Sequence, residues 1–202
     1  MPPRYIANGN CSVCEPAYRP LFRFELYLSA MNHRPPVTLP QAATRARDGW
    51  PALAGWILLM VGLGAASGIL FGPDDWYGTL LKPTWNPPSW VFGPVWTALY
   101  VSMAVALWLV RREPDVDEPV LRHALALFVI QFLLNLAWTP LFFGLHTPGF
   151  AFLDICLLWI TLLSTMLMFG RVRALAGYLL LPYLLWVSFA LVLNGTIWLM
   201  NL

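Results

Sequence analysis

The chain has 202 residues, of which 59% are hydrophobic and 11% are charged, with a net charge of +2 and a mean hydropathy of +0.64. A soluble domain carries about 25% charged residues, so this composition predicts a protein whose main solvent is lipid. The small net charge, and the lack of a basic stretch interleaved with aromatic residues, argue against nucleic acid as a partner.

Residues 1–48 differ from the rest of the chain, because they hold six of the eleven arginines and no apolar run long enough to cross a bilayer. We expect a mostly disordered extension here, without a recognisable signal peptide. Cys11 and Cys14 form a lone C-x-x-C that lacks a second pair of ligands, so it does not predict a metal site. Met31 is a second candidate start, which leaves open whether the extension belongs to the mature protein.

Five apolar runs follow, each close to the ~20 residues that a helix needs to cross ~30 Å of hydrocarbon. Runs of this length without strand-like alternation predict helices, since a helix satisfies its own backbone hydrogen bonds in lipid. We therefore predict an all-α integral membrane protein, a five-transmembrane-helix bundle formed by residues 49–202 as one domain. The predicted spans are approximately 50–71, 89–110, 120–143, 150–169 and 174–200.

Arginines mark one end of this predicted bundle, before the first span, between the second and third, and between the fourth and fifth. They are Arg45, Arg47, Arg111, Arg112, Arg122, Arg171 and Arg173. The opposite end has only Lys82, the single lysine of the chain. The positive-inside rule places the arginine end in the cytoplasm. A bacterial cell membrane is favoured, with the outer membrane as the alternative.

Three predicted helices each gather polar and aromatic residues on one face. The faces are Gln131, Asn135, Trp138 and Phe142 in the third span, Phe92, Trp96, Tyr100 and Met103 in the second, and Tyr183, Trp186, Ala190, Leu193 and Asn194 in the fifth. Amides in hydrocarbon are costly unless they are hydrogen-bonded, so these faces should point into the bundle. Two interpretations stay open: the amides join helices around a filled core, or the faces line a cavity for a flat, mostly apolar ligand.

Other polar residues give weaker signals. Asp154 is the only acid within a predicted span, with a functional role and a capping role both open. His123 and His146 are expected near the membrane interface. No arrangement for acid–base or nucleophilic catalysis, or for a metal, is evident, so we predict no firm catalytic residue, no metal site and no required cofactor. Gly64 and Gly68 form a GxxxG that suits packing within the bundle, slightly favoured, or a homodimer.

Several motifs occur in a distinctive order: WY at 76–77, KPTWNPPSW at 82–90, GPVWTALY at 93–100, QFLLNLAW at 131–138, PYLLW at 182–186 and LNGTIWLMN at 193–201. Together they resemble the tryptophan-rich sensory protein (TspO/MBR) family, whose animal members are called translocator protein or peripheral benzodiazepine receptor. The resemblance covers residues 50–201. It implies a five-helix bundle with a pocket under the first loop, which binds porphyrins.

The resemblance also implies a set of ligand-binding residues. These are Tyr77, Trp85, Trp96, Tyr100, Asn135, Trp138, Phe150, Leu157, Trp186, Ala190 and Leu193. Three prolines stiffen the first loop, so we expect Trp85 to lie over the pocket mouth as part of a lid. Trp90 reads as an interface anchor. Lys82 is a candidate partner for a porphyrin propionate, with snorkelling to the interface as the equal alternative.

The implied function is that of a membrane receptor or sensor for porphyrins, such as protoporphyrin IX and haem-type tetrapyrroles, with a regulatory role in tetrapyrrole or stress responses. One alternative is an enzyme that degrades porphyrin with light and oxygen through Trp96 and Trp186. Another is a porphyrin transporter, although repeated halves are not seen. Residues 191–202 lack the tyrosine and arginine of the cholesterol motif found in animal members, which favours a bacterial type of role.

Overall fold

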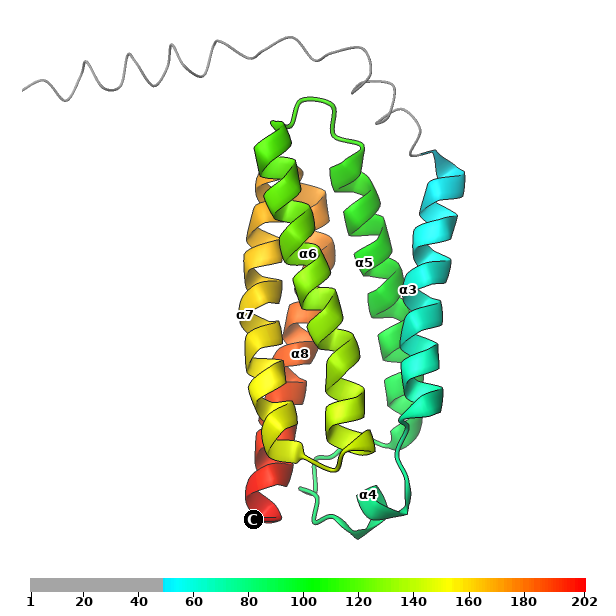
Figure 1. Ribbon diagram of the computed structural model, residues 1–202, viewed down its shortest axis with the longest axis vertical. Helices are drawn as coiled ribbons and strands as arrows, with labels where there is room; N and C mark the ends of the chain where they lie inside the picture. The colour runs from blue at the N-terminus through cyan, green and yellow to red at the C-terminus, as the bar shows by residue number, and fades with distance from the viewer. Residues whose placement is uncertain (1–48) are drawn as a thin grey trace, which may run out of the picture. The chain divides into compact units, whose positions relative to one another are not determined.

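The computed structural model describes residues 49–202, in which all regular structure is helical (Figure 1). Five long helices lie side by side: α3 (Trp50–Leu70), α5 (Phe92–Arg111), α6 (Glu118–Thr139), α7 (Pro148–Val172) and α8 (Ala174–Met200). All five are long and apolar enough to cross a membrane. The predicted all-α, five-helix membrane fold is confirmed. The predictions for residues 1–48, including those for Cys11, Cys14, Arg45 and Arg47, lie outside the described residues.

Short helical elements occupy the connections at one end of the bundle. They are α4 (Asp75–Thr79) and the 3₁₀ helix η1 (Ser89–Val91) between α3 and α5, and the π-helical turn η2 (Pro140–Gly144) that follows α6. Asp74 caps α4, since its carboxylate accepts a hydrogen bond from the backbone N–H of Tyr77. A proline stands in the first turn of α3, α6 and α7, where the missing N–H has no helical partner to lose.

The limits of the helices agree with the predicted spans to within a few residues. The main difference is the fourth span, because α7 begins at Pro148 and continues to Val172. Gly170 does not end this helix. A Cβ on Gly177 would be only 2.8 Å from the Cα of Gly170, so the two glycines allow the backbones of α7 and α8 to approach closely near their connection.

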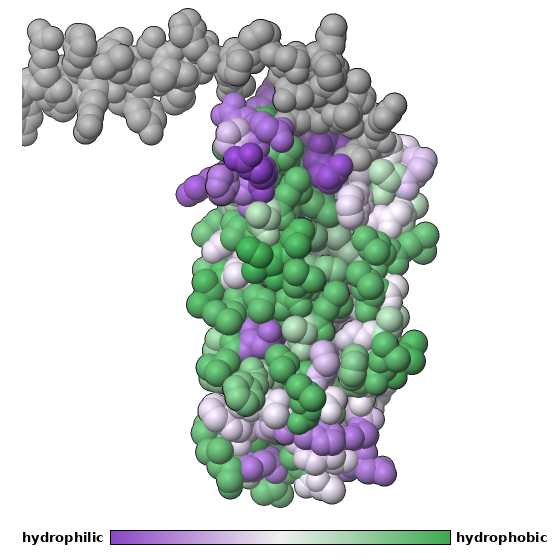
Figure 2. Space-filling model, viewed as in Figure 1, coloured by the Kyte–Doolittle hydropathy of each residue, from purple (hydrophilic) through white to green (hydrophobic). Residues whose placement is uncertain are grey.

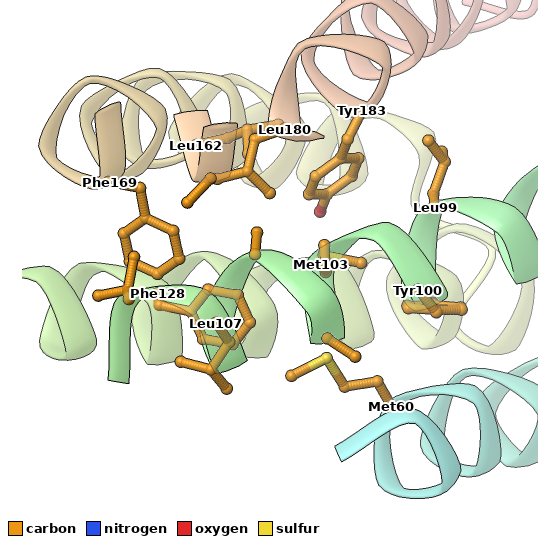
Figure 3. Close-up of a cluster of buried hydrophobic side chains, with 14 of the residues drawn as sticks. Met60, Leu99, Tyr100, Met103, Leu107, Phe128, Leu162, Phe169, Leu180 and Tyr183 are labelled. Atoms are coloured by element: carbon orange, nitrogen blue, oxygen red, sulfur yellow. The ribbon is translucent and has the colours of Figure 1, made fainter. Parts of the chain in front are cut away.

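The helices pack unequally. α7 lies along both α6 and α8, and α5 lies between α3 and α8. The core contains the stacked rings of Phe128 and Phe169, whose centroids are 5.6 Å apart (Figure 3). α3 packs mainly on α5 and buries only Met60. Apolar side chains cover the middle of the visible surface between two more polar ends, as lipid contact requires (Figure 2).

Candidate functional site

A cavity of about 490 Å³ lies in the end of the bundle that carries α4. Its walls come from all five long helices and from the connection between α3 and α5. Eight aromatic side chains line it: Tyr77, Phe92, Trp96, Tyr100, Trp138, Phe142, Phe143 and Trp186. None of the lining residues carries a charge. A cavity of this kind suits a flat, mostly apolar molecule that is oriented by a few neutral polar groups.

The aromatic walls are built from rings that support one another. Trp96 stacks on Tyr100 one helical turn further along α5, with ring centroids 5.6 Å apart. Trp138 stacks on Phe142 at 5.1 Å, across the junction between α6 and η2. Trp186 on α8 meets the edge of Phe92 at 5.9 Å. These contacts limit the rotamers of the rings, so the cavity walls are preorganised.

Two buried amides tie the walls together. The Tyr100 hydroxyl donates a 2.9 Å hydrogen bond to Oδ1 of Asn135, which joins α5 to α6. The indole N–H of Trp138 donates to Oδ1 of Asn194 at 2.9 Å, and Nδ2 of Asn194 donates to the carbonyl of Pro148 at 2.9 Å. Both amides also line the cavity. The amides therefore do both things that the sequence left open: they join helices, and they line a shared cavity.

Gln131 shares a face with Asn135 but does not reach the cavity. Its side chain is fully buried and donates only a long 3.9 Å contact to the sulfur of Met103. Its Oε1 has no partner among residues 49–202. Asp154 is also buried and outside the lining. Neither residue is placed where it could touch a molecule in the cavity.

The two glycines of the GxxxG in α3 have different roles. A Cβ on Gly64 would overlap the ring of Tyr100, so this glycine permits close packing of α3 on α5 inside the bundle. Gly68 also lines the cavity, but nothing lies within 4 Å of the place where its Cβ would be. The intramolecular role favoured by the sequence thus applies to Gly64, whereas Gly68 faces open space in the cavity.

Residues 72–88, which we call the lid, cover the cavity mouth. Gly72, Pro73, Tyr77, Asn86 and Pro87 of the lid belong to its lining. Lys82 Nζ lies 4.4 Å from the centre of the Tyr77 ring and donates to the carbonyl of Leu80 at 3.1 Å. Burial raises the pKa of the Tyr77 phenol, so it remains a neutral hydroxyl at the mouth.

The structure brings most of the predicted ligand-binding residues to the cavity. Those that line it are Tyr77, Trp96, Tyr100, Asn135, Trp138, Trp186, Ala190 and Leu193. Trp85 does not: this residue is 46% exposed, and its ring makes a T-shaped contact with Phe189 of α8. Binding of a ligand by any of these residues stays a prediction.

Phe150 and Leu157 are also not brought to the cavity, because their side chains are 67% and 55% exposed on the outer face of α7. The inner face of this helix carries Ile155 and Leu158, which line the cavity instead. α7 is apolar on nearly all sides, so hydrophobic periodicity does not distinguish its faces. Asp154 does not distinguish the faces either, because Phe150 and Leu157 stand four residues before it and three residues after it, on its own side of the helix.

Comparison with known proteins places the chain in a family. A sequence model of the TspO/MBR family matches residues 56–199. The chain is 48% identical over 134 residues to the tryptophan-rich protein TspO of Chlorobaculum tepidum, covering 64% of this chain and 82% of that protein. It is 38% identical over 137 residues to the tryptophan-rich sensory protein of Cereibacter sphaeroides, covering 68% and 84%. It is 40% identical over 123 residues to the Homo sapiens translocator protein, covering 61% and 73%. The chain belongs to the TspO/MBR family and is an integral, multi-pass membrane protein.

Proposed function

We propose that this protein is a membrane receptor or sensor that binds porphyrins, such as protoporphyrin IX and haem-type tetrapyrroles, in the cavity between its helices. The observation that carries the proposal is the cavity of about 490 Å³ with aromatic walls and no charged lining residue. A regulatory role in tetrapyrrole or stress responses is part of the proposal. It is supported by the name of the Cereibacter sphaeroides relative, which describes that protein as sensory.

The walls explain how such a ligand would be held. The faces of Trp96, Trp138 and Trp186 would contact the macrocycle, and stacking between aromatic surfaces contributes about 0.5–1.5 kcal/mol per pair beyond burial. The carboxylate edge of a porphyrin would remain at the mouth, since a charge in the uncharged interior would lose its hydration. Lys82 over Tyr77 is a cation at that mouth. The ligand would therefore lie with its apolar side deep and its propionates outward.

A cavity-filling substitution tests this proposal directly. Gly68→Leu would place a branched side chain in the open space of the cavity, so the affinity for protoporphyrin IX should fall at least tenfold. Gly62→Leu is the matched control, because Gly62 lies on the same helix, also has open space around it, and is not a lining residue. Quenching of tryptophan fluorescence by added protoporphyrin measures both affinities. Equal affinities for the two variants and the wild type would exclude this cavity as the site.

A second candidate function is degradation of bound porphyrin with light and oxygen. The observation that favours it is that Trp96 and Trp186, two oxidisable indoles, line the same cavity. Illumination of the complex in air should bleach the porphyrin absorption faster than illumination of free porphyrin. The double variant Trp96→Phe and Trp186→Phe should lose this acceleration. Bleaching at the rate of free porphyrin, with the ligand bound, would leave binding without catalysis.

A further inference from the structure

His146 connects the lid to the segment between η2 and α7. It lies between η2 and α7, and its Nε2 is 3.0 Å from Oδ2 of Asp74, at the start of the lid. Its ring also stacks on Trp76 of α4, with centroids 4.2 Å apart and an interplanar angle of 22°. One imidazole therefore contacts the lid through a polar bond and through a flat aromatic surface.

The backbone at His146 is unusual. Its φ is 53°, and it is the only non-glycine residue with a positive φ in the described part of the chain. This left-handed conformation is unfavourable for residues with a Cβ, although histidine tolerates it better than most. Contacts that over-determine the conformation are needed to maintain it. Backbone hydrogen bonds on either side hold this turn, from the Leu145 N–H to the Pro140 carbonyl at 2.8 Å and from the Thr147 N–H to the Leu141 carbonyl at 3.2 Å. The turn presents the imidazole to Asp74 and Trp76.

A second tie holds the lid farther along the chain. The side chain of Asn201 accepts a 2.9 Å hydrogen bond from the Leu81 N–H and donates a 2.9 Å bond to the Leu81 carbonyl. An amide does not change its charge with pH. The lid is thus held before α4 by the ionisable pair His146 and Asp74, and after α4 by the uncharged bonds between Asn201 and Leu81.

We propose that His146 and Asp74 form a proton-operated latch that holds the lid closed over the cavity at mildly acidic pH and loosens it at alkaline pH. An ionised carboxylate only accepts hydrogen bonds, so Nε2 carries the proton of the bond in both states. When a proton from water binds the other ring nitrogen, the imidazole becomes positive, and charge attraction is added to the hydrogen bond. Loss of that proton leaves the hydrogen bond and the stack, but removes the attraction.

The charges around the latch favour this behaviour. The lid carries Asp74, Asp75 and Lys82, of which Asp74 is bonded to the imidazole and Lys82 lies over Tyr77. His146 is the only ionisable side chain from Thr139 to Leu153, and α8 has none from Leu184 to Met200. The described arginines are at the other end of the bundle, so the positive-inside rule directs the lid away from the cytoplasm. The latch would then respond to the pH outside that compartment.

Backbone hydrogen exchange tests the latch without any ligand. The protein in nanodiscs is exchanged at pH 5.5 and pH 8.0, and the rates for residues 72–88 are corrected for the intrinsic effect of pH. Exposed ion pairs are weak, so the corrected rate should be about two- to fivefold higher at pH 8.0. His146→Gln keeps a side-chain hydrogen-bond donor, but its amide stays neutral at both pH values. In this variant the corrected rates should be equal at pH 5.5 and pH 8.0.

Asn201→Ala is the matched control, because it removes the other tie. Its lid should exchange faster at both pH values while the ratio between them stays as in the wild type. Equal corrected rates in the wild type would overturn the latch, as would a pH effect that survives His146→Gln with helix content intact by circular dichroism. The effect of the latch on a ligand rests on the proposed function. The exchange experiment does not, so the two can fail separately.

Discussion

The ring of Tyr100 fills the space that a side chain on Gly64 would need. Gly64→Ala should therefore push α3 away from α5 and lower the free energy of unfolding by about 1–3 kcal/mol, as overpacking of a core does. The displaced ring should also weaken the bond from Tyr100 to Asn135. Thermal unfolding in detergent, followed by circular dichroism, measures the change. Gly68→Ala is the control, because nothing lies within 4 Å of the place where its Cβ would be. An unchanged melting temperature for Gly64→Ala would contradict the close packing of α3 on Tyr100.

Removal of the Asn194 amide should destabilise the cavity wall. Asn194→Ala leaves the Trp138 N–H and the Pro148 carbonyl without this partner, at a cost of about 1–2 kcal/mol. Thr196→Ala removes only a bond within α8 and should change stability by less than about 0.5 kcal/mol. Unfolding in a denaturing detergent compares the variants, and the emission of Trp138 should shift only in the first. Similar stability of both variants would show that this bond contributes little.

The charge of Lys82 should matter only for ligands with free carboxylates, if the proposed function holds. Lys82→Gln removes a cation that lies over Tyr77 at the mouth, so binding of protoporphyrin IX should weaken about two- to fivefold at low salt. The dimethyl ester of protoporphyrin lacks the carboxylates, and its affinity should not change. Fluorescence titrations with both compounds separate the charge effect from a change in lid shape. An equal loss for both would assign Lys82 a structural role.

Protonation of Asp74 should open the lid at the acid limit. The backbone N–H of Tyr77 lowers the pKa of this carboxyl from its usual 3.8, with His146 contributing. The folded state therefore favours the carboxylate, and its contribution is complete above the usual pKa and lost as the pH falls through the lowered value. Corrected exchange of residues 72–88 should rise as the pH falls below the usual pKa of 3.8. In Asp74→Asn, with helix content unchanged, that rise should vanish; its persistence would point to another group.

The sequence was most informative where a residue's environment follows from its chemistry alone. Long apolar runs predict five helical spans, because in lipid every backbone N–H and C=O must find a hydrogen-bond partner within the protein. Asn135 and Asn194 are predicted to point inward because an amide exposed to lipid lacks such a partner. Trp96 and Trp186 are predicted to point inward for the same reason, because they share helix faces with polar residues. The GxxxG, by contrast, did not reveal that its two glycines face different surroundings, since that depends on where Tyr100 lies.

Other parts of the site depend on contacts between distant segments. Phe150 and Leu157 belong to a helix that is apolar on almost every side, so the sequence did not indicate which residues face the cavity. Trp85 is not part of the lining, and its ring packs instead against Phe189 of α8, more than 100 positions later in the chain. The pairing of His146 with Asp74 joins residues 72 positions apart, and no local sequence pattern in either segment predicts it.

The order of the buried amides along the chain has a consequence for biogenesis. α3 holds no amide or charged side chain, so it is stable in the bilayer as soon as it leaves the translocation machinery. Gln131 and Asn135 contact Met103 and Tyr100, and Asn194 contacts Trp138 and Pro148. In each case the partner belongs to a segment synthesised earlier. Each amide therefore enters the membrane after its partner is in place, and its exposure to hydrocarbon during insertion is brief.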